Sequence, residues 1–544
     1  MIRKKEKKRP FDLFFDFILG HPFISISLVC LMLLPFGFAE ASHITTEGIV
    51  FEAIIWILAL AAIIVFGRPS KSQKINIGLV VISAVVIILF SMMTGENSSH
   101  SEVMFIPAAF ILFMFALVMR NEKTLTVDRA VFLLMVLGVF VRYCFVLTYN
   151  SAVPFLQHDV GNFTGTAGHE AYIMYWYKNG LVLPDFDVTK WTYWQFYHPP
   201  FHHITMALVM NIFTTLGLPL DWAQEAIQIM PMIYSALSMV ACYRIFKLVN
   251  LEGAGLVVAM LFPCFYPTFI IWSGAYNNDM LATLFMLLAM LCTLKWYKKP
   301  TLLNILPIAL CVGFGMMTKL SAWMVAPAIA FIFLWVFIKN IKTKALPLIG
   351  QYAVFGVVSV PLGLWWGIRN FIEFETPLTF VPDLKNQSMS VANIPVADRL
   401  FDFSLYQFDY PFLAFANHRA PYNEFNPFMG LVKTSIFDEY HIPWTFNEMA
   451  TALVIIFSVV ALISFGFLVF FLFKKNTAAD MPAKLFFIIT LVTIVVCYYI
   501  FCFKFPYVCT ENIRYCIPII PILALGLGFG VNTLSSVFKC SKTE

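Results

Sequence analysis

Long hydrophobic runs separated by short polar stretches extend from about residue 22 to residue 538. A helix that crosses a bilayer needs roughly 20 mostly apolar residues, and runs of about that length recur along the whole chain. They fall at about 22–39, 49–66, 75–93, 103–119, 130–148, 226–248, 254–272, 280–297, 302–317, 320–339, 346–367, 450–473, 483–503 and 513–538. The pattern predicts an all-α polytopic membrane protein with about fourteen transmembrane helices.

The composition supports this class. Of 544 residues, 60% are hydrophobic and 12% are charged, and the mean hydropathy is +0.80, whereas a soluble protein carries about 25% charged residues. The net charge of +5 says little about acidic partners, because in a membrane protein the distribution of the positive charges matters more. The basic N-terminus leads into the first apolar run, which we expect to be an uncleaved helix; a cleaved signal peptide is the alternative.

Along the first helices, predicted loops that contain lysine and arginine alternate with predicted loops that lack them. The basic residues precede the first helix and follow the second and the fourth. Cytoplasmic loops of membrane proteins carry an excess of such residues. Both termini are therefore predicted to be cytoplasmic, and the loop after the fifth helix to lie outside. The apolar stretch 201–217 is predicted to lie in the outer interface, because counting it as a span would place the lysines of every later loop on the outside.

This topology divides the chain into four expected parts. Residues 1–129 form a basic segment with a four-helix membrane extension. Residues 130–368 form a membrane core that includes an outer loop, 149–225. Residues 369–449 form a large outer loop, and 450–544 a C-terminal three-helix membrane segment.

The outer stretch 149–203 is rich in aromatic and titratable residues and interrupts the series of apolar runs. It is the predicted functional face. Its carboxylates and histidines are Asp159, Glu170, Asp185, Asp187, His158, His169, His198, His202 and His203. Asp159 could act as a general base toward an acceptor hydroxyl, or could simply form a turn. His158 beside it is a candidate substrate-binding residue. Glu170 could assist at the site, or could favour the N-terminus of a short amphipathic helix between Gly168 and Gly180.

His198 belongs to Tyr197-His198-Pro199-Pro200, where proline holds the preceding residue in an extended conformation. A contact with a phosphate or hydroxyl is the preferred interpretation. A metal pair with His202 is the weaker one, because the prolines break the helical spacing that such a pair needs. No metal site is predicted, although the sequence is compatible with a divalent metal.

Four further charged residues stand at predicted outer helix ends. Asp279, in Asn277-Asn278-Asp279, could cap the next helix or contact substrate. Lys319, Arg369 and Arg514 are placed to meet a lipid phosphate, or could snorkel to the interface. Snorkelling alone does not explain three cations at one leaflet opposite a group of carboxylates.

These landmarks, in this order, resemble the GT-C superfamily of integral-membrane glycosyltransferases, in particular the branch of protein O-mannosyltransferases and lipid A aminoarabinose transferases. The motifs are HD at Asp159, YHPPFHH, the outer NND turn, TKLS around Lys319, and IRN and IRY near the C-terminus. The resemblance implies that a sugar moves from a polyprenyl-phosphate carrier to an acceptor with inversion.

By the same resemblance, Asp159 matches the family's catalytic carboxylate, and Lys319, Arg369 and Arg514 match cations that meet the carrier phosphate. The chain departs from the family in two places. Val160 follows Asp159 where protein mannosyltransferases have a glutamate, and His198 stands where aminoarabinose transferases have a lysine. A protein acceptor and an aminoarabinose donor are both in doubt for this reason.

The expected partners are a polyprenyl-phosphate-linked sugar, membrane lipids, and an acceptor that is a glycan, lipid or protein of the cell envelope. No separate cofactor is expected, because the lipid-linked sugar is a substrate, and nothing in the sequence indicates nucleic acid. A polytopic transporter or lipid flippase is the alternative, but such proteins more often carry internal repeats and acids near the membrane midplane.

Overall fold

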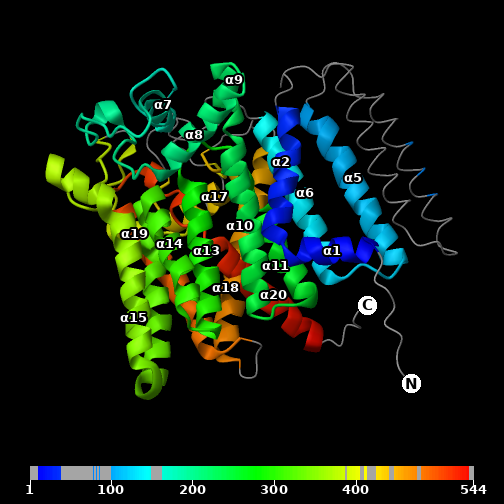
Figure 1. Ribbon diagram of the computed structural model, residues 1–544. Coiled ribbons are helices and arrows are strands. Elements are labelled where there is room, and N and C mark those ends of the chain that lie inside the picture. The colour runs from blue at the N-terminus through cyan, green and yellow to red at the C-terminus, as the bar shows by residue number, and fades with distance from the viewer. Residues whose placement is uncertain are drawn as a thin grey trace. The chain divides into compact units, whose positions relative to one another are not determined.

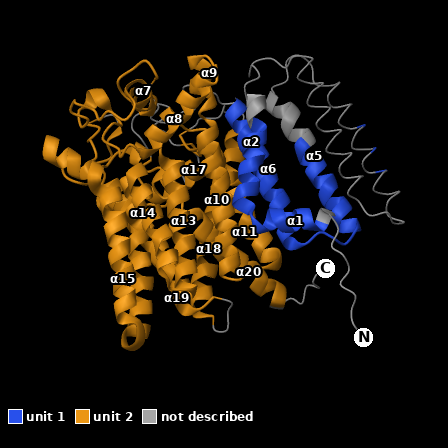
Figure 2. Cartoon of the chain, viewed as in Figure 1, with its two compact units in different colours: residues 1–152 blue, residues 153–544 orange. Residues whose placement is uncertain are grey.

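The computed structural model describes residues 10–37, 78, 81, 85, 100–148, 162–385, 389–404, 408, 410–412, 424–439, 446–474 and 479–537. Their regular structure is helical, apart from an isolated antiparallel bridge between Ser390 and Tyr507. The predicted all-α polytopic class is confirmed. By its contacts the chain divides into two compact units, residues 1–152 and 153–544 (Figure 2).

The described part of the first unit contains α1 (Pro10–Gly20), α2 (Pro22–Gly37), α5 (His100–Asn121) and α6 (Val127–Thr148). The chain bends by 100° between α1 and α2, where Pro22 disfavours a helical conformation of the residue before it. Arg129 in α6 pairs with Asp12 in α1 at 3.0 Å. Arg142 is fully buried and donates to the carbonyl oxygen of Gly138 at 2.8 Å, as expected for a cation inside a membrane helix.

In the second unit long apolar helices run side by side, with α7, α8 and α9 at one end of them (Figure 1). Its elements are α7 (His169–Asn179), η2 (Trp191–Tyr193), α8 (Phe201–Thr215), α9 (Leu220–Ala226), α10 (Ile229–Leu248), α11 (Gly253–Phe265), α12 (Pro267–Ile271), α13 (Asp279–Lys298), α14 (Leu302–Thr318), η3 (Leu320–Val325), α15 (Ala326–Phe374), α16 (Val396–Phe401), α17 (Pro427–Phe437), α18 (Asn447–Phe473), α19 (Met481–Lys504), η8 (Val508–Thr510), η9 (Ile513–Tyr515) and α20 (Ile519–Val537).

Helix α15 is a hairpin of two spans. Its backbone leaves the helical region at Lys344, with φ −138° and ψ 22°. Beyond this break the chain packs back on itself, because the hydroxyl of Tyr352 donates to the carbonyl oxygen of Phe333 at 2.7 Å and their rings stack with centroids 4.9 Å apart. The two apolar runs predicted at 320–339 and 346–367 thus lie side by side.

Seven helices among the described residues are long and apolar enough to cross a membrane. Three shorter apolar helices, Ala108–Asn121, Gly253–Phe265 and Leu302–Thr318, accompany them. The predicted number of about fourteen is not confirmed, and the runs at 49–66 and 75–93 lie outside the described residues. The stretch 201–217 does form a separate helix, α8, whose place in the outer interface stays a prediction.

An aromatic core holds α7 and the following loop onto the membrane helices. Gly168 and Gly180 flank α7 with φ of 96° and 62°, conformations that favour glycine. The ring of Tyr172 stacks on Phe196 with centroids 4.3 Å apart. The indole nitrogen of Trp366 in α15 donates to the carbonyl oxygen of Tyr197 at 3.0 Å. The His-Pro-Pro segment is therefore tied to the end of a membrane helix.

Candidate functional site

A cavity of about 540 Å³ lies between the loop after α7, the N-terminus of α13, η3, α15, the stretch after α15, α19 and the η8–η9 segment. Four of the residues predicted from the sequence line it: His198, Asp279, Lys319 and Arg514. The first and last of these positions are more than three hundred residues apart in the chain. The sequence could place the four residues only at a common depth in the membrane, whereas the fold brings their side chains together.

Lys319 and Asp279 form a buried ion pair in this cavity. Lys319 is in an extended conformation between α14 and η3, and its ammonium group contacts the carboxylate of Asp279. The two side chains are 11% and 4% exposed. Asp279 is the first residue of α13, where the helix dipole favours a carboxylate. The capping interpretation of Asp279 is not supported, because Asn278 occupies the N-cap position and no side chain caps this helix.

Arg514, in the C-terminal part of the chain, also lines this cavity. Its guanidinium carbon lies 4.9 Å from the centre of the Tyr515 ring, and its Nη2 donates to the hydroxyl of Tyr515 at 2.8 Å. The ammonium nitrogen of Lys319 lies 5.0 Å from the centre of this ring. Tyr515 therefore holds two cations near each other.

The described lining of the cavity is positive. Lys319, Lys504 and Arg514 contribute three cations, against the single carboxylate of Asp279. Sequence reasoning missed Lys504, which ends α19. Its signal was available, because a lysine at the predicted outer end of a span departs from the cytoplasmic preference of basic residues. This balance favours an anionic ligand.

His169 is a second lining residue that was not among the predicted site residues. Its Nδ1 lies 2.8 Å from Nε2 of His203, and its ring lies 5.8 Å from that of His198. His203 is fully buried, and burial together with the neighbouring histidines His169 and His202 lowers its pKa well below 6.5. A neutral His203 can fix the tautomer of His169 through this hydrogen bond.

Apolar side chains form most of the remaining wall. They come from η3, α15, α19 and the stretch after α15, and include Trp323, Met324, Leu364, Leu378, Ile500 and Phe501. A cavity with a cationic region beside an apolar wall suits an amphiphile with an anionic head and an apolar tail.

Glu170 and Arg369 lie outside the described lining of the cavity. The guanidinium of Arg369 donates to the carbonyl oxygen of Pro184, pairs with Glu373 at 2.9 Å, and lies 5.2 Å from the centre of the Trp366 ring. It thereby fastens the loop after α7 to the end of α15. Its expected contact with a carrier phosphate stays a prediction.

Glu170, in the first turn of α7, is only 6% exposed. Burial, with a smaller contribution from the charge of Glu225, raises its pKa from 4.5 to about 8. Folding therefore favours the protonated form, and the stability that this contributes is complete below pH 4.5 and is lost as the pH rises through about 8.

Replacing Glu170 with glutamine should keep this site neutral at every pH. We expect the midpoint of thermal unfolding in detergent to rise by a few degrees relative to wild type at about pH 9, with little change at about pH 5. Equal unfolding midpoints for the two proteins across this pH range would show that Glu170 ionises normally.

Asp159 and His158 lie outside the described residues, so their predicted roles stay predictions. Among the described residues, no group of three or more histidine, cysteine or acidic side chains could hold a metal ion. His202, the weaker metal candidate, is fully buried and contacts the carbonyl oxygen of Tyr276 through Nε2 at 2.8 Å.

Comparison with known families addresses one segment that contributes to this cavity, including His198, Asp279 and Lys319. Residues 197–366 match the family model described as dolichyl-phosphate-mannose-protein mannosyltransferase, which is a GT-C family. This segment of the chain is thus similar to a GT-C family. No curated protein matches the chain.

The GT-C match confirms the resemblance inferred from the sequence motifs. It begins at Tyr197, ends at Trp366, and contains His198, Asp279 and Lys319. Arg514 lies beyond it. The match supports a membrane glycosyltransferase that uses a lipid-linked sugar donor.

Proposed function

We propose that the protein is an inverting glycosyltransferase that moves a sugar from a polyprenyl-phosphate carrier to a cell-envelope acceptor on the outer face of the membrane. The observation that carries the proposal is the cavity in which Lys319 and Arg514 flank Tyr515 beside an apolar wall. The phosphate of the donor would lie at these cations, and its polyprenyl tail along the wall formed by η3, α15 and α19.

In this reaction the bond between the anomeric carbon and the phosphate oxygen breaks as the bond to the acceptor oxygen forms. The leaving polyprenyl phosphate gains negative charge, which a fixed ammonium and guanidinium stabilise in a water-poor site. Asp279 holds the ammonium of Lys319 in place before the donor arrives. His169 and His198 line the same cavity and could donate hydrogen bonds to the phosphate or the sugar.

The acceptor hydroxyl must lose its proton as it attacks, and in our proposal Asp159 takes this proton as the general base. Attack from the face opposite the phosphate inverts the anomeric centre. A carboxylate base on one side of the sugar and cations on the other satisfy both charge changes of the reaction.

The distribution of basic residues supports an outer location of the cavity. Helix α13 has 20 residues, about 30 Å, with Asp279 at the cavity and Lys298 at the far end, where the lysine donates to the carbonyl oxygen of Leu248 at 2.6 Å. Arg244, Lys247, Lys295 and Lys299 belong to the same helix ends. Because cytoplasmic loops carry such an excess, the cavity end would face outward, with both termini cytoplasmic.

Analysis of a strain from which the gene is deleted tests the proposal. Mass spectrometry of envelope glycans and lipid-linked sugars should show one sugar missing from its acceptor and its polyprenyl-phosphate donor accumulating. Restoration by the wild-type gene is expected. If donor and glycans are both unchanged, the glycosyltransferase proposal fails. If the protein were a transporter, the purified protein would not release polyprenyl phosphate from the donor.

Replacing Arg514 with glutamine should reduce kcat/KM for the lipid-linked donor about 10- to 100-fold, the range expected for losing a charged hydrogen bond. Arg514→Lys should recover part of this loss, because it restores the charge without the planar guanidinium. Wild-type kinetics in Arg514→Gln would remove Arg514 from the phosphate site.

A further inference from the structure

The segment that carries Arg514 has little regular structure of its own. Between α19 and α20 the chain forms only two 3-10 turns, η8 and η9. Tyr507, Thr510, Arg514 and Tyr515 of this segment line the cavity. The internal hydrogen bonds of these turns are local, as from the N–H of Glu511 to Val508 and from the N–H of Cys516 to Ile513, so the placement of Arg514 in the cavity depends on contacts of the segment with neighbouring elements.

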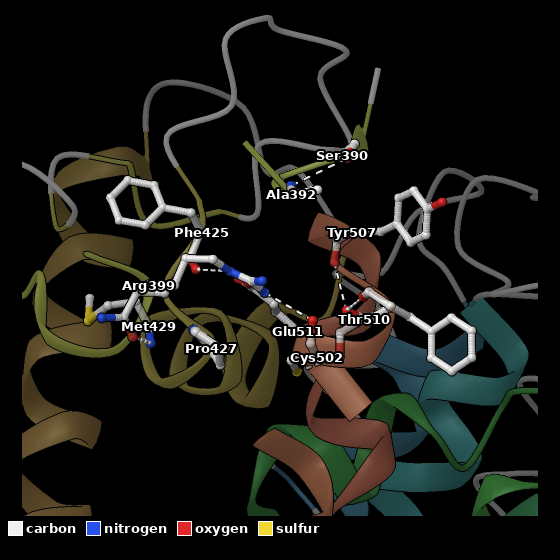
Figure 3. Close-up of polar contacts among 12 residues, drawn as sticks. Ser390, Ala392, Arg399, Phe425, Pro427, Met429, Cys502, Tyr507, Thr510 and Glu511 are labelled. Atoms are coloured by element: carbon white, nitrogen blue, oxygen red, sulfur yellow. Dashed lines mark hydrogen bonds and ion pairs between the residues drawn. The ribbon is translucent and has the colours of Figure 1, made fainter. Parts of the chain in front are cut away.

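Arg399 of α16 makes several of the fixing contacts (Figure 3). It is 3% exposed and lies 3.8 Å from a carboxylate oxygen of Glu511, which is 0% exposed. It also donates to the carbonyl oxygen of Cys502 at 3.0 Å and to that of Phe425 at 3.4 Å. The guanidinium of Arg399 thus connects α16 with three other parts of the chain. These are Phe425, just before α17; Cys502, near the end of α19; and Glu511, in the segment that carries Arg514.

Helix α17 contacts the same segment directly. The hydroxyl oxygen of Thr434 accepts a hydrogen bond from the backbone N–H of Ile513 at 2.9 Å. The side-chain amide of Asn512 donates to Asp438, immediately after α17, at 2.7 Å. A second buried ion pair, Lys433 with Glu424 at 3.2 Å, lies in the same region.

Gly430 brings the backbone of α17 against Glu511. A Cβ atom at this position would lie 2.6 Å from Cβ of Glu511 and 2.9 Å from its carbonyl oxygen. Contacts this short cannot be relieved by rotating a flexible side chain, so any larger residue at position 430 must move the backbone near Glu511.

Contacts from the preceding stretch support the segment nearer its start. The hydroxyl of Tyr507 donates to Asp383 at 2.6 Å, and the backbone N–H of Val391 donates to the carbonyl oxygen of Pro506 at 2.9 Å. The segment is therefore held by α16, by α17 and by contacts with Asp383 and Val391.

We propose that α16 and α17 form a clamp that positions Arg514 and Tyr515 in the cavity, with Arg399, Gly430 and Glu511 as positioning residues. The contact between Arg399 and Glu511, at 3.8 Å, is longer than a hydrogen bond. The geometry is fixed by the hydrogen bonds from Arg399 to the carbonyl oxygens of Cys502 and Phe425 and by the packing of Gly430 against Glu511. The outer loop 369–449 thereby acquires a function in catalysis, which rests on the proposed contact of Arg514 with the donor phosphate.

The most direct test is Gly430→Ala. Moving Glu511 should displace Arg514, which lies three residues further on, and kcat/KM for the lipid-linked donor should fall about 10- to 100-fold, mainly through a higher KM. Gly466→Ala is the matched control, because a Cβ there meets nothing within 4 Å. It should leave KM unchanged. Unchanged kinetics in correctly folded Gly430→Ala would overturn the clamp.

Glu511→Gln provides a second variant that adds no atoms to the packed interface. It exchanges a carboxylate oxygen beside Arg399 for an amide. Because burial raises the pKa of Glu511 from 4.5 to about 8, the variant should raise KM for the donor several-fold above about pH 8, with normal expression. A fall in kcat alone, or wild-type kinetics, would contradict a positioning role.

A double variant separates this inference from the proposed function. If the clamp acts through Arg514, Gly430→Ala should have little further effect on KM in the Arg514→Gln background. An equal fold-change in both backgrounds would overturn the clamp and leave the glycosyltransferase proposal intact. Wild-type kinetics in Arg514→Gln alone would instead overturn the role of Arg514 and the clamp with it.

Discussion

Replacing Lys319 with methionine is expected to reduce sugar transfer about 100- to 1,000-fold, the loss seen when one preorganised charge-stabilising donor is removed from an active site. Its ammonium is nearly buried and lines the cavity, and in our proposal it stabilises the charge that develops on the leaving phosphate. The unbranched methionine retains most of the volume. Release of polyprenyl phosphate from the donor by purified protein measures the effect.

Lys319→Met also leaves the carboxylate of Asp279 buried without its cation, which destabilises a protein by itself. The double variant Lys319→Met/Asp279→Asn removes both charges and should recover the expression and unfolding temperature of wild type without recovering transfer. Wild-type transfer by this double variant would show that Lys319 has only a structural role.

Replacing Asp159 with asparagine is expected to abolish detectable transfer while leaving expression and membrane insertion intact. Asparagine keeps the shape of the side chain but cannot take a proton from the acceptor hydroxyl, and general-base catalysis contributes about 100- to 10,000-fold to rates. Binding of the donor should change little, because the phosphate contacts are made elsewhere. Turnover and donor binding measured on the same preparation separate these effects.

Asp185→Asn is the matched control for the Asp159 variant. Asp185 is an exposed carboxylate of the same outer loop and lies outside the described lining of the cavity, so its replacement should leave turnover close to wild type. Wild-type turnover in Asp159→Asn would remove Asp159 from the mechanism, whereas equal losses in both variants would point to a general effect of charge in the loop.

The sequence predicted the helical architecture well where hydrophobic length decides it. The glycine-bounded helix α7 and the two spans joined at Lys344 follow from local signals. The break between α1 and α2 was not predicted, because the pattern was assessed only for apolar length, although Pro22 marks it. The number of spans depends on how each helix meets the lipid, which hydropathy alone does not determine.

For the candidate site, the sequence indicated the depth of each charged residue in the membrane but not the direction of its side chain. The stripe Gly363, Trp366, Gly367 and Asn370 lines the cavity, with the spacing of one helical face. Arg369 lies off this face although it has the same depth. In α7, His169 lines the cavity and Glu170 does not, because adjacent helical residues point about 100° apart.

The central claim, that Lys319 and Arg514 bind the phosphate of a polyprenyl carrier, is tested most directly by native mass spectrometry of the purified protein with polyprenyl phosphate. This readout needs neither the sugar nor the acceptor. Wild type should retain polyprenyl phosphate in preference to the uncharged polyprenol, and the Lys319→Met/Arg514→Gln variant should lose that preference. Equal retention of both lipids by wild type, or an unchanged preference in the double variant, would contradict this claim.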